Sequence, residues 1–426
     1  MHQVWSFRRT RELLRKLRHP DYLERDALAT ALRCALGTAT ARDAVLAAID
    51  GALTGPDDAL LRRIIVGVDL EGRPTKAIAA ELHLSERHCF RHRAHALDAI
   101  SSQIEILVRE RARPSLDALA AYARGRALWR RRTPETVRAA IDCFAEALRA
   151  APSMAKAHCG IADARLIEAE YLFAEPRASF AAALVAVERA LELEPHLAEA
   201  HAALADIRLF GSRDFRGAAR AIDAALSADP ACVDARLFAV WHALARGDTG
   251  VALEHVGEVL VHAPEAVDGL TALGVVRTFE GRYDDAITLL RGVVETDAGY
   301  AVARYELARA LTCAERYDAA LEILDGFGGD ARWHHVTALT VRCRAARDGR
   351  NVHPLAELAA LPPYQRAVAL IGLARYDEAI DALHLAIFEG DPWVVFVRTD
   401  PLLAALHRRF GFRAVAESVR RTTAVA

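Results

Sequence analysis

The chain has 426 residues, of which 53% are hydrophobic and 26% charged, and its formal net charge is −2. This length exceeds one ordinary core, so we expect two or more folded units, and the near-neutral balance excludes a uniformly basic nucleic-acid-binding protein. The 7 cysteines include no CxxC pair, which argues against a disulfide framework and against a cysteine zinc knuckle.

Charge is distributed unevenly along the chain. Residues 1–113 carry 19 Arg and Lys against 15 Asp and Glu, whereas the remainder carries 36 against 42. A mildly basic head followed by an acidic body weakly indicates nucleic-acid binding by the head. The chain contains neither an apolar leader nor an uncharged apolar run of about 18 residues, so we expect a cytoplasmic protein without membrane contact.

The first hundred residues carry helix signals. Proline opens the stretch PDYLERDALATALRCAL, glycines end DAVLAAIDGALTG, and Gly72 ends PDDALLRRIIVGVDLEG. We therefore expect an all-helical unit over residues 1–113.

The segment TKAIAAELHLSERHCFRHRAHAL, residues 75–97, predicts two helices joined by a tight corner. Thr75 is a candidate cap for the first helix and Ser85 for the second. His83 lies at the corner, and histidine tolerates a left-handed backbone better than most side chains. The apolar seam predicted to hold the helices at an angle comprises Ile78, Ala79, Leu82, Leu84, Cys89 or Phe90, and Leu97.

The longer stretch LRRIIVGVDLEGRPTKAIAAELHLSERHCFRHRAHALDAI resembles the DNA-binding module of sigma factor region four and LuxR-type regulators. The preceding RELLRKLRHPDYLERDALATAL resembles a helical lead-in found with such modules in bacterial multidomain regulators. The resemblance implies a helix-turn-helix at about residues 75–97 that binds double-stranded DNA, although His83 stands where the family usually has glycine. The residues implied to contact DNA are Thr75, Lys76, Ser85, Glu86, Arg87, His88, Arg91 and His92.

Two other interpretations of the second helix stay open. Its polar face is also what the solvated surface of a protein-binding domain would present. His88, His92 and His95 share one helical face and are candidate metal ligands, but this spacing alone does not supply a complete ligand set. We therefore assign no metal and no cofactor.

From about residue 116 the chain repeats itself. Each copy has a small residue three positions after its start and often a proline fifteen positions after it. The starts from 180 to 317 are separated by 35, 34, 34 and 34 residues, which is the period of a helix-turn-helix solenoid. The copies start at Val137, Phe180, Phe215, Thr249, Tyr283, Tyr317 and Tyr376.

This pattern resembles the tetratricopeptide repeat family over roughly residues 116–410. Small residues let neighbouring helices approach, and prolines end the units. The longer intervals 137–180 and 317–376 predict an insertion of about nine residues and a degraded unit, respectively. We expect an all-α protein with a solenoid of about seven to eight helix pairs over residues 114–426. The matching positions are Ala140, Ala183, Ala218, Ala252, Ala286, Ala320, Ala379, Pro152, Pro195, Pro230, Pro264 and Leu273–Gly274.

The first repeats and the tail GDPWVVFVRTDPLLAALHRRFGF resemble the repeat domain fused to bacterial transcription regulators and signalling enzymes. In that family the tail closes the array, which implies that Phe410 and Phe412 pack on the last unit. The resemblance also implies that residues of the first helices line a groove that binds a protein or peptide. The alternative is that the aromatic residues Trp241 and Tyr305 only pack between helices. The implied groove residues are Asp234, Trp241, Asp268, Thr271, Tyr305 and Arg309.

These patterns predict a DNA-binding transcription regulator whose repeat array binds a partner or mediates oligomerisation. Paired half-sites on DNA would require a homodimer. The alternative is an interaction scaffold whose head binds a protein, such as RNA polymerase, rather than DNA. The sequence contains no GxxxxGK, GxSxG or HExxH motif, so we expect no enzymatic activity.

Overall fold

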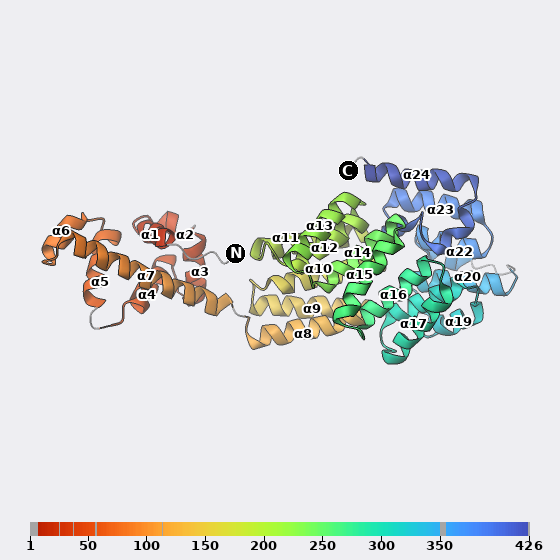
Figure 1. Ribbon diagram of the computed structural model, residues 1–426, viewed down its shortest axis with the longest axis horizontal. Coiled ribbons are helices and arrows are strands. Elements are labelled where there is room, and N and C mark those ends of the chain that lie inside the picture. Colours follow the sequence, from red (N-terminus) through yellow and green to blue (C-terminus); the bar gives the residue numbers. More distant parts are fainter. Residues whose placement is uncertain are drawn as a thin grey trace. The chain divides into compact units, whose positions relative to one another are not determined.

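The computed structural model describes residues 7–24, 26–36, 38–55, 58–112, 114–349 and 355–424. Contacts between residues divide the chain into two compact units, Met1–Pro114 and Ser115–Ala426 (Figure 1). Every regular element within the described ranges is helical, which confirms the predicted all-α class. None of the helices described is long and apolar enough to cross a membrane.

The first unit is organised around one long helix, α7. This helix packs against α1, α3, α4, α5 and α6 (Figure 1). Its residues Leu97, Ile100 and Ile104 are buried with Leu14 and Leu32 in the main core of the unit. The elements are α1 (Phe7–Lys16), α2 (Pro20–Glu24), α3 (Ala27–Leu36), α4 (Ala41–Ala52), α5 (Asp58–Ile65), the π-helical turn η1 (Val66–Leu70), α6 (Thr75–Glu81) and α7 (Glu86–Ala112).

A buried ion pair fixes η1 against α7. Nε of Arg93 donates to Oδ2 of the buried Asp69 at 2.8 Å, and Nη2 of Arg93 donates to the other oxygen. Arg18 donates to the carbonyl oxygens of Val68 and Asp69 at 2.9 and 3.0 Å. Because these bonds satisfy a charge that is removed from water, they determine where the segment before α6 lies.

The second unit is an array of antiparallel helix pairs (Figure 1). Seven regular pairs lie within its described residues, and the predicted degraded unit corresponds to α20 and the short α21. This confirms the predicted solenoid. The pairs are α8 (Leu116–Arg131) with α9 (Pro134–Ala150), α10 (Ala155–Glu170) with α11 (Pro176–Leu193), α12 (Ala198–Asp206) with α13 (Phe215–Ala228), α14 (Val233–Arg246) with α15 (Thr249–His262), α16 (Val267–Phe279) with α17 (Tyr283–Thr296), α18 (Ala301–Cys313) with α19 (Tyr317–Asp325), and α22 (Pro363–Gly372) with α23 (Tyr376–Glu389). The remaining elements are the π-helical turn η2 (Ile207–Gly211), α20 (His334–Arg347), α21 (Leu355–Ala360), the 3₁₀ helices η3 (Pro392–Phe396) and η4 (Pro401–Leu406), and α24 (Phe410–Ala424).

Small residues set the spacing of these helices. All seven alanines that the repeat pattern identified are fully buried. A Cβ atom at Gly125 or Gly160 would lie 2.6 Å from the ring of Phe144, so both glycines make room for this buried side chain. The close packing of α8, α9 and α10 therefore depends on residue size as well as on hydrophobicity.

The long repeat connects distant parts of the array. The turn after α10 contains Tyr171 and Phe173, whose rings lie 6.0 and 5.1 Å from that of Trp333, just before α20. Arg332 also forms an ion pair with Glu135 of α9. The additional residues thus join the second repeat to the region near the degraded unit.

The tail after α23 runs along the inner face of the array. The ring of Phe396 lies 5.8 Å from Phe210 and 6.0 Å from Trp241. Phe412 is buried against the last pair, as the resemblance implied, but Phe410 is 101% exposed. The expectation for Phe410 was therefore wrong: as the first residue of α24 it projects into solvent, and the second aromatic two positions on packs instead.

Candidate functional site

The first candidate site is the helical corner of the first unit. Helix α6 ends at Glu81, and His83 adopts the left-handed conformation with φ 56° before α7 begins. Oγ of Ser85 accepts a hydrogen bond from the backbone N–H of His88 at 3.3 Å, as expected of a cap. The expectation for Thr75 was wrong, because it is the first residue of α6, Pro74 takes the cap position, and no side chain caps the helix.

A small apolar cluster braces this corner. It is formed by Ile64, Ile78, Ala79 and Cys89, with Leu82 and Leu84 packed partly against it. The sequence left open whether Cys89 or Phe90 belongs to the apolar seam. Phe90 is 52% exposed, so Cys89 is the residue that does. Leu97 belongs to the main core of the unit.

Polar side chains cover the opposite side of α7. Glu86, Arg87, His88 and Arg91 are exposed, as is Lys76 on α6, whereas Thr75 and His92 are half-buried. Arg87 and Arg91 form no ion pair with the described residues, so their guanidinium groups are available for phosphates or guanine edges. The described residues contain no group of three or more His, Cys, Asp or Glu side chains that could hold a metal ion.

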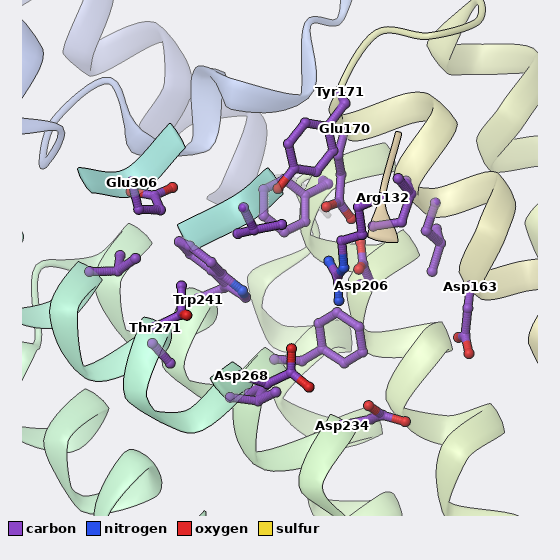
Figure 2. Close-up of a pocket in the computed structure, with 18 of the residues that line it drawn as sticks. Arg132, Asp163, Glu170, Tyr171, Asp206, Asp234, Trp241, Asp268, Thr271 and Glu306 are labelled. Carbon is purple, nitrogen blue, oxygen red and sulfur yellow. The ribbon is translucent and has the colours of Figure 1, made fainter. Parts of the chain in front are cut away.

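The second candidate site is a groove inside the solenoid (Figure 2). Its space measures about 920 Å³, including the part open to solvent. First helices of successive repeats supply its acidic residues, and aromatic side chains form much of its walls. The acidic residues are Asp163 and Glu170 of α10, Asp206 of α12, Asp234 of α14, Asp268 of α16 and Glu306 of α18. The aromatic residues are Trp129, Tyr171, Phe210, Phe238, Trp241, Tyr300 and Trp393.

Arginines of α8 neutralise part of this acidic lining. Nη1 of Arg126 lies 2.7 Å from Oδ2 of Asp163, and Nη2 of Arg126 lies 4.0 Å from Oδ2 of Asp234. Arg132 ends α8 in the left-handed conformation, with φ 51°. Its guanidinium carbon therefore lies 4.6 Å from the centre of the Trp129 ring, at the edge of the groove.

Burial changes the proton affinity of the groove carboxyls. Burial, partly offset by the positive charge of Arg126, raises the pKa of Asp163 to about 7. Burial also raises the pKa values of Asp206 and Glu170, whose side chains hydrogen-bond to each other. Raised pKa values in two adjacent carboxyls favour a proton shared between them.

Four of the six predicted groove residues line this site: Asp234, Trp241, Asp268 and Thr271. Tyr300 donates its hydroxyl proton to Oδ1 of Asp268 at 2.7 Å. Tyr305 and Arg309 do not line this groove. Arg309 is buried beneath the tail, where its Nη2 donates to Oδ1 of Asp400 at 2.9 Å, and Tyr305 packs against His335 with ring centres 5.7 Å apart.

Sequence reasoning missed Asp163, Glu170, Asp206 and Arg132. A signal for two of them is present: Asp163 and Asp206 are both the ninth residue of their helices, and 43 residues separate them. The repeat starts Val137 and Phe180 have the same separation. Nothing in the repeat pattern indicates the position of Arg132, because it depends on the end of α8.

Comparison with known proteins identifies the kind of repeat in the helical array. Tetratricopeptide repeat models match residues 207–266, 239–301 and 280–332. Residues 207–332 therefore match tetratricopeptide repeats, as the resemblance of the repeat pattern implied. No curated protein matches the chain.

Several solved structures resemble the chain at low identity. The structure of the human IFIT1 dimer with PPP-AAAA is 15% identical, with 98% of this chain and 99% of that chain covered and a TM-score of 0.46. Yeast Tom70 is 16% identical over 99% of this chain and 87% of its own, with a TM-score of 0.39. A tetratricopeptide repeat protein from Parabacteroides merdae is 10% identical over 72% of this chain and 99% of its own, with a TM-score of 0.36.

Proposed function

We propose that this protein is an interaction scaffold that binds a segment of a partner protein in the groove of its second unit. The observation that carries the proposal is the continuous lining of the groove by first helices of successive repeats, from α10 to α18. Aromatic walls with polar groups between them suit the burial of a few anchoring side chains. This supports the sequence-based alternative of a scaffold more than it supports a regulator.

Charge reversal in the groove tests this function. The protein is purified from its host with its partners after nuclease treatment, as wild type and as the variant Asp234→Lys/Asp268→Lys. The control, Asp223→Lys/Glu254→Lys, changes two exposed acids on the second helices α13 and α15. We expect the wild type and the control to retain one partner that the groove variant loses. A partner retained equally by all three would place the interaction elsewhere.

A second candidate function is DNA binding by the first unit, which would make the chain a transcription regulator. The specific observation that favours it is the pair of exposed arginines, Arg87 and Arg91, at the start of a helix braced by α6. An arginine in this position suits the reading of guanine in the major groove.

Selection of bound fragments from genomic DNA at near-physiological salt tests this second function, since affinity depends strongly on salt. The proteins compared are the wild type, Arg87→Ala/Arg91→Ala, and the control Arg138→Ala/Arg149→Ala, which removes two exposed arginines of α9. Enrichment of one motif by the wild type and the control only would support DNA reading by α7. Absence of enrichment with folded wild type would remove this candidate function.

A further inference from the structure

Two adjacent carboxyl groups in the groove, those of Asp206 and the half-buried Glu170, each leave one buried oxygen without a hydrogen-bond donor among the described residues. Asp206 is 2% exposed, and neither its Oδ1 nor Oε1 of Glu170 receives a hydrogen bond from a donor among the described residues. Figure 2 shows Asp206 and Glu170 beside Arg132 within the groove. Buried carboxyl oxygens without donors are unfavourable, so the pair is stabilised either by a shared proton or by a cation that replaces it.

Arg132 lies beside the pair, and its positive charge lowers the pKa values of both carboxyls, but it donates no hydrogen bond to either. Its guanidinium group stacks over Trp129, and its Nε atom also lacks a partner among the described residues. Both carboxyl residues line the groove, and the aromatic side chains of Tyr171 and Trp241 are also part of the lining. Aromatic faces add to the stabilisation of an organic cation held near carboxylates.

A second group without a hydrogen-bond partner is a donor rather than an acceptor. The indole N–H of Trp129 is a donor only; the side chain is 8% exposed, and the N–H faces no acceptor among the described residues. A ligand that satisfies Trp129 must carry an acceptor, such as a peptide carbonyl oxygen. The groove therefore offers acceptors for a cation and a donor for a carbonyl group.

We infer that the groove binds an extended basic segment of the partner protein, with one arginine or lysine side chain inserted against Asp206 and Glu170. This inference rests on the proposed scaffold function and adds the chemistry of the partner. The extended form follows from the acidic lining, which continues from α10 through α12 and α14 to α16 and so exceeds the length of one small amine.

Fluorine NMR of the full chain labelled with 5-fluorotryptophan tests the inference, because Trp129, Trp241 and Trp393 line the groove and Trp333 does not. The probes are acetyl-Ala-Ala-Arg-Ala-Ala-amide, the same peptide with uncharged citrulline in place of arginine, and agmatine, each up to about 10 mM. We expect the arginine peptide to shift the groove resonances saturably and to shift that of Trp333 less, because Trp333 contacts the groove only through Tyr171. The citrulline peptide should bind at least about tenfold more weakly, because it lacks the charge. Equal binding of the two peptides, or no shift with either, would overturn the inference.

Agmatine separates a peptide from a small amine as the source of the cation. We expect it to bind more weakly than the arginine peptide, because it cannot supply a carbonyl to Trp129. Agmatine that binds as tightly as the peptide would contradict the inferred protein segment.

Isosteric variants locate the cation. Asp206→Asn and Glu170→Gln keep side-chain size and should each weaken binding of the arginine peptide about tenfold, whereas Asp223→Asn on the exposed face of α13 should not. Binding to the wild type should also strengthen from pH 5 to pH 8, because the cation displaces the shared proton. A partner complex that survives both groove variants would leave the scaffold function standing and contradict this inference.

Discussion

The buried carboxyl group of Asp391, between α23 and η3, makes the stability of the fold depend on pH. Its Oδ1 accepts the backbone N–H of Trp393 at 3.0 Å, so the residue caps η3. The side chain is buried, and burial raises its pKa from 3.8 to about 7. Its ionisation therefore opposes folding, in contrast to that of a salt-bridged carboxylate.

The expected consequence is a loss of stability as pH rises. Below pH 4 the carboxyl is protonated in both states; between pH 4 and 7 it is protonated in the folded state only, so the free energy of unfolding falls by up to about 1.4 kcal/mol per pH unit. Asp391→Asn preserves an acceptor for the cap and removes this dependence. Urea unfolding midpoints at pH 5 and pH 8 measure the difference, and parallel changes in the two proteins would disprove the assignment.

At the scale of elements, helix spacing follows from small residues. The alanine and proline positions in the sequence were sufficient to predict the second helices, because their pattern recurs at a fixed period. Gly125 and Gly160 were not identified, since their role depends on Phe144 of an adjacent helix. The corner at His83 was predicted, whereas the cap before α6 was not, because Pro74 and Thr75 are both acceptable at a helix start.

Two glycine substitutions test helix spacing. Gly160→Ala in α10 should lower the free energy of unfolding by about 1–3 kcal/mol, because its Cβ atom would collide with Phe144. Gly257→Ala in α15 is the matched control. No atom lies within 4 Å of its new Cβ atom, so it should raise stability by up to about 1 kcal/mol. Chemical unfolding measures both, and equal effects would refute the packing argument.

The ion pair between Asp69 and Arg93 allows a second test within the first unit. Arg93→Met leaves a buried carboxylate without its partner, at an expected cost of about 3–5 kcal/mol. The double variant Asp69→Leu/Arg93→Met should cost much less. Hydrogen exchange of α6 and α7 in the full chain, followed by mass spectrometry, reports on the local loss. If α6 and α7 exchange as fast in the double variant as in Arg93→Met, the proposed role of the pair is contradicted.

At the scale of the whole molecule, the sequence predicts the two units and the repeats more completely than it predicts the tail. Repeats depend on neighbours about 34 residues away, so their pattern is periodic. The tail depends on single contacts such as the bond from Nε1 of Trp393 to the carbonyl oxygen of Glu170 at 2.7 Å, 223 residues apart. These contacts have no repeat, so the covering of Tyr305 and Arg309 could not be predicted.

The tail also explains which part of the inner face is available to a partner. Asp400 of the tail covers Arg309 and accepts a hydrogen bond from it, while Asp234, Trp241 and Asp268 still line open space. A groove shortened in this way accommodates one anchored segment more readily than a long partner helix. We therefore propose that the partner binds to the N-terminal half of the second unit.

Photo-crosslinking in cells tests the proposed use of the groove most directly. Benzoylphenylalanine replaces Trp241 in the groove, Val261 on the exposed face of α15, or Phe90 on the exposed face of α7. If the groove binds the partner, one partner protein is crosslinked from position 241 and not from the other two. Crosslinks from position 90 or 261, with none from position 241, would contradict it.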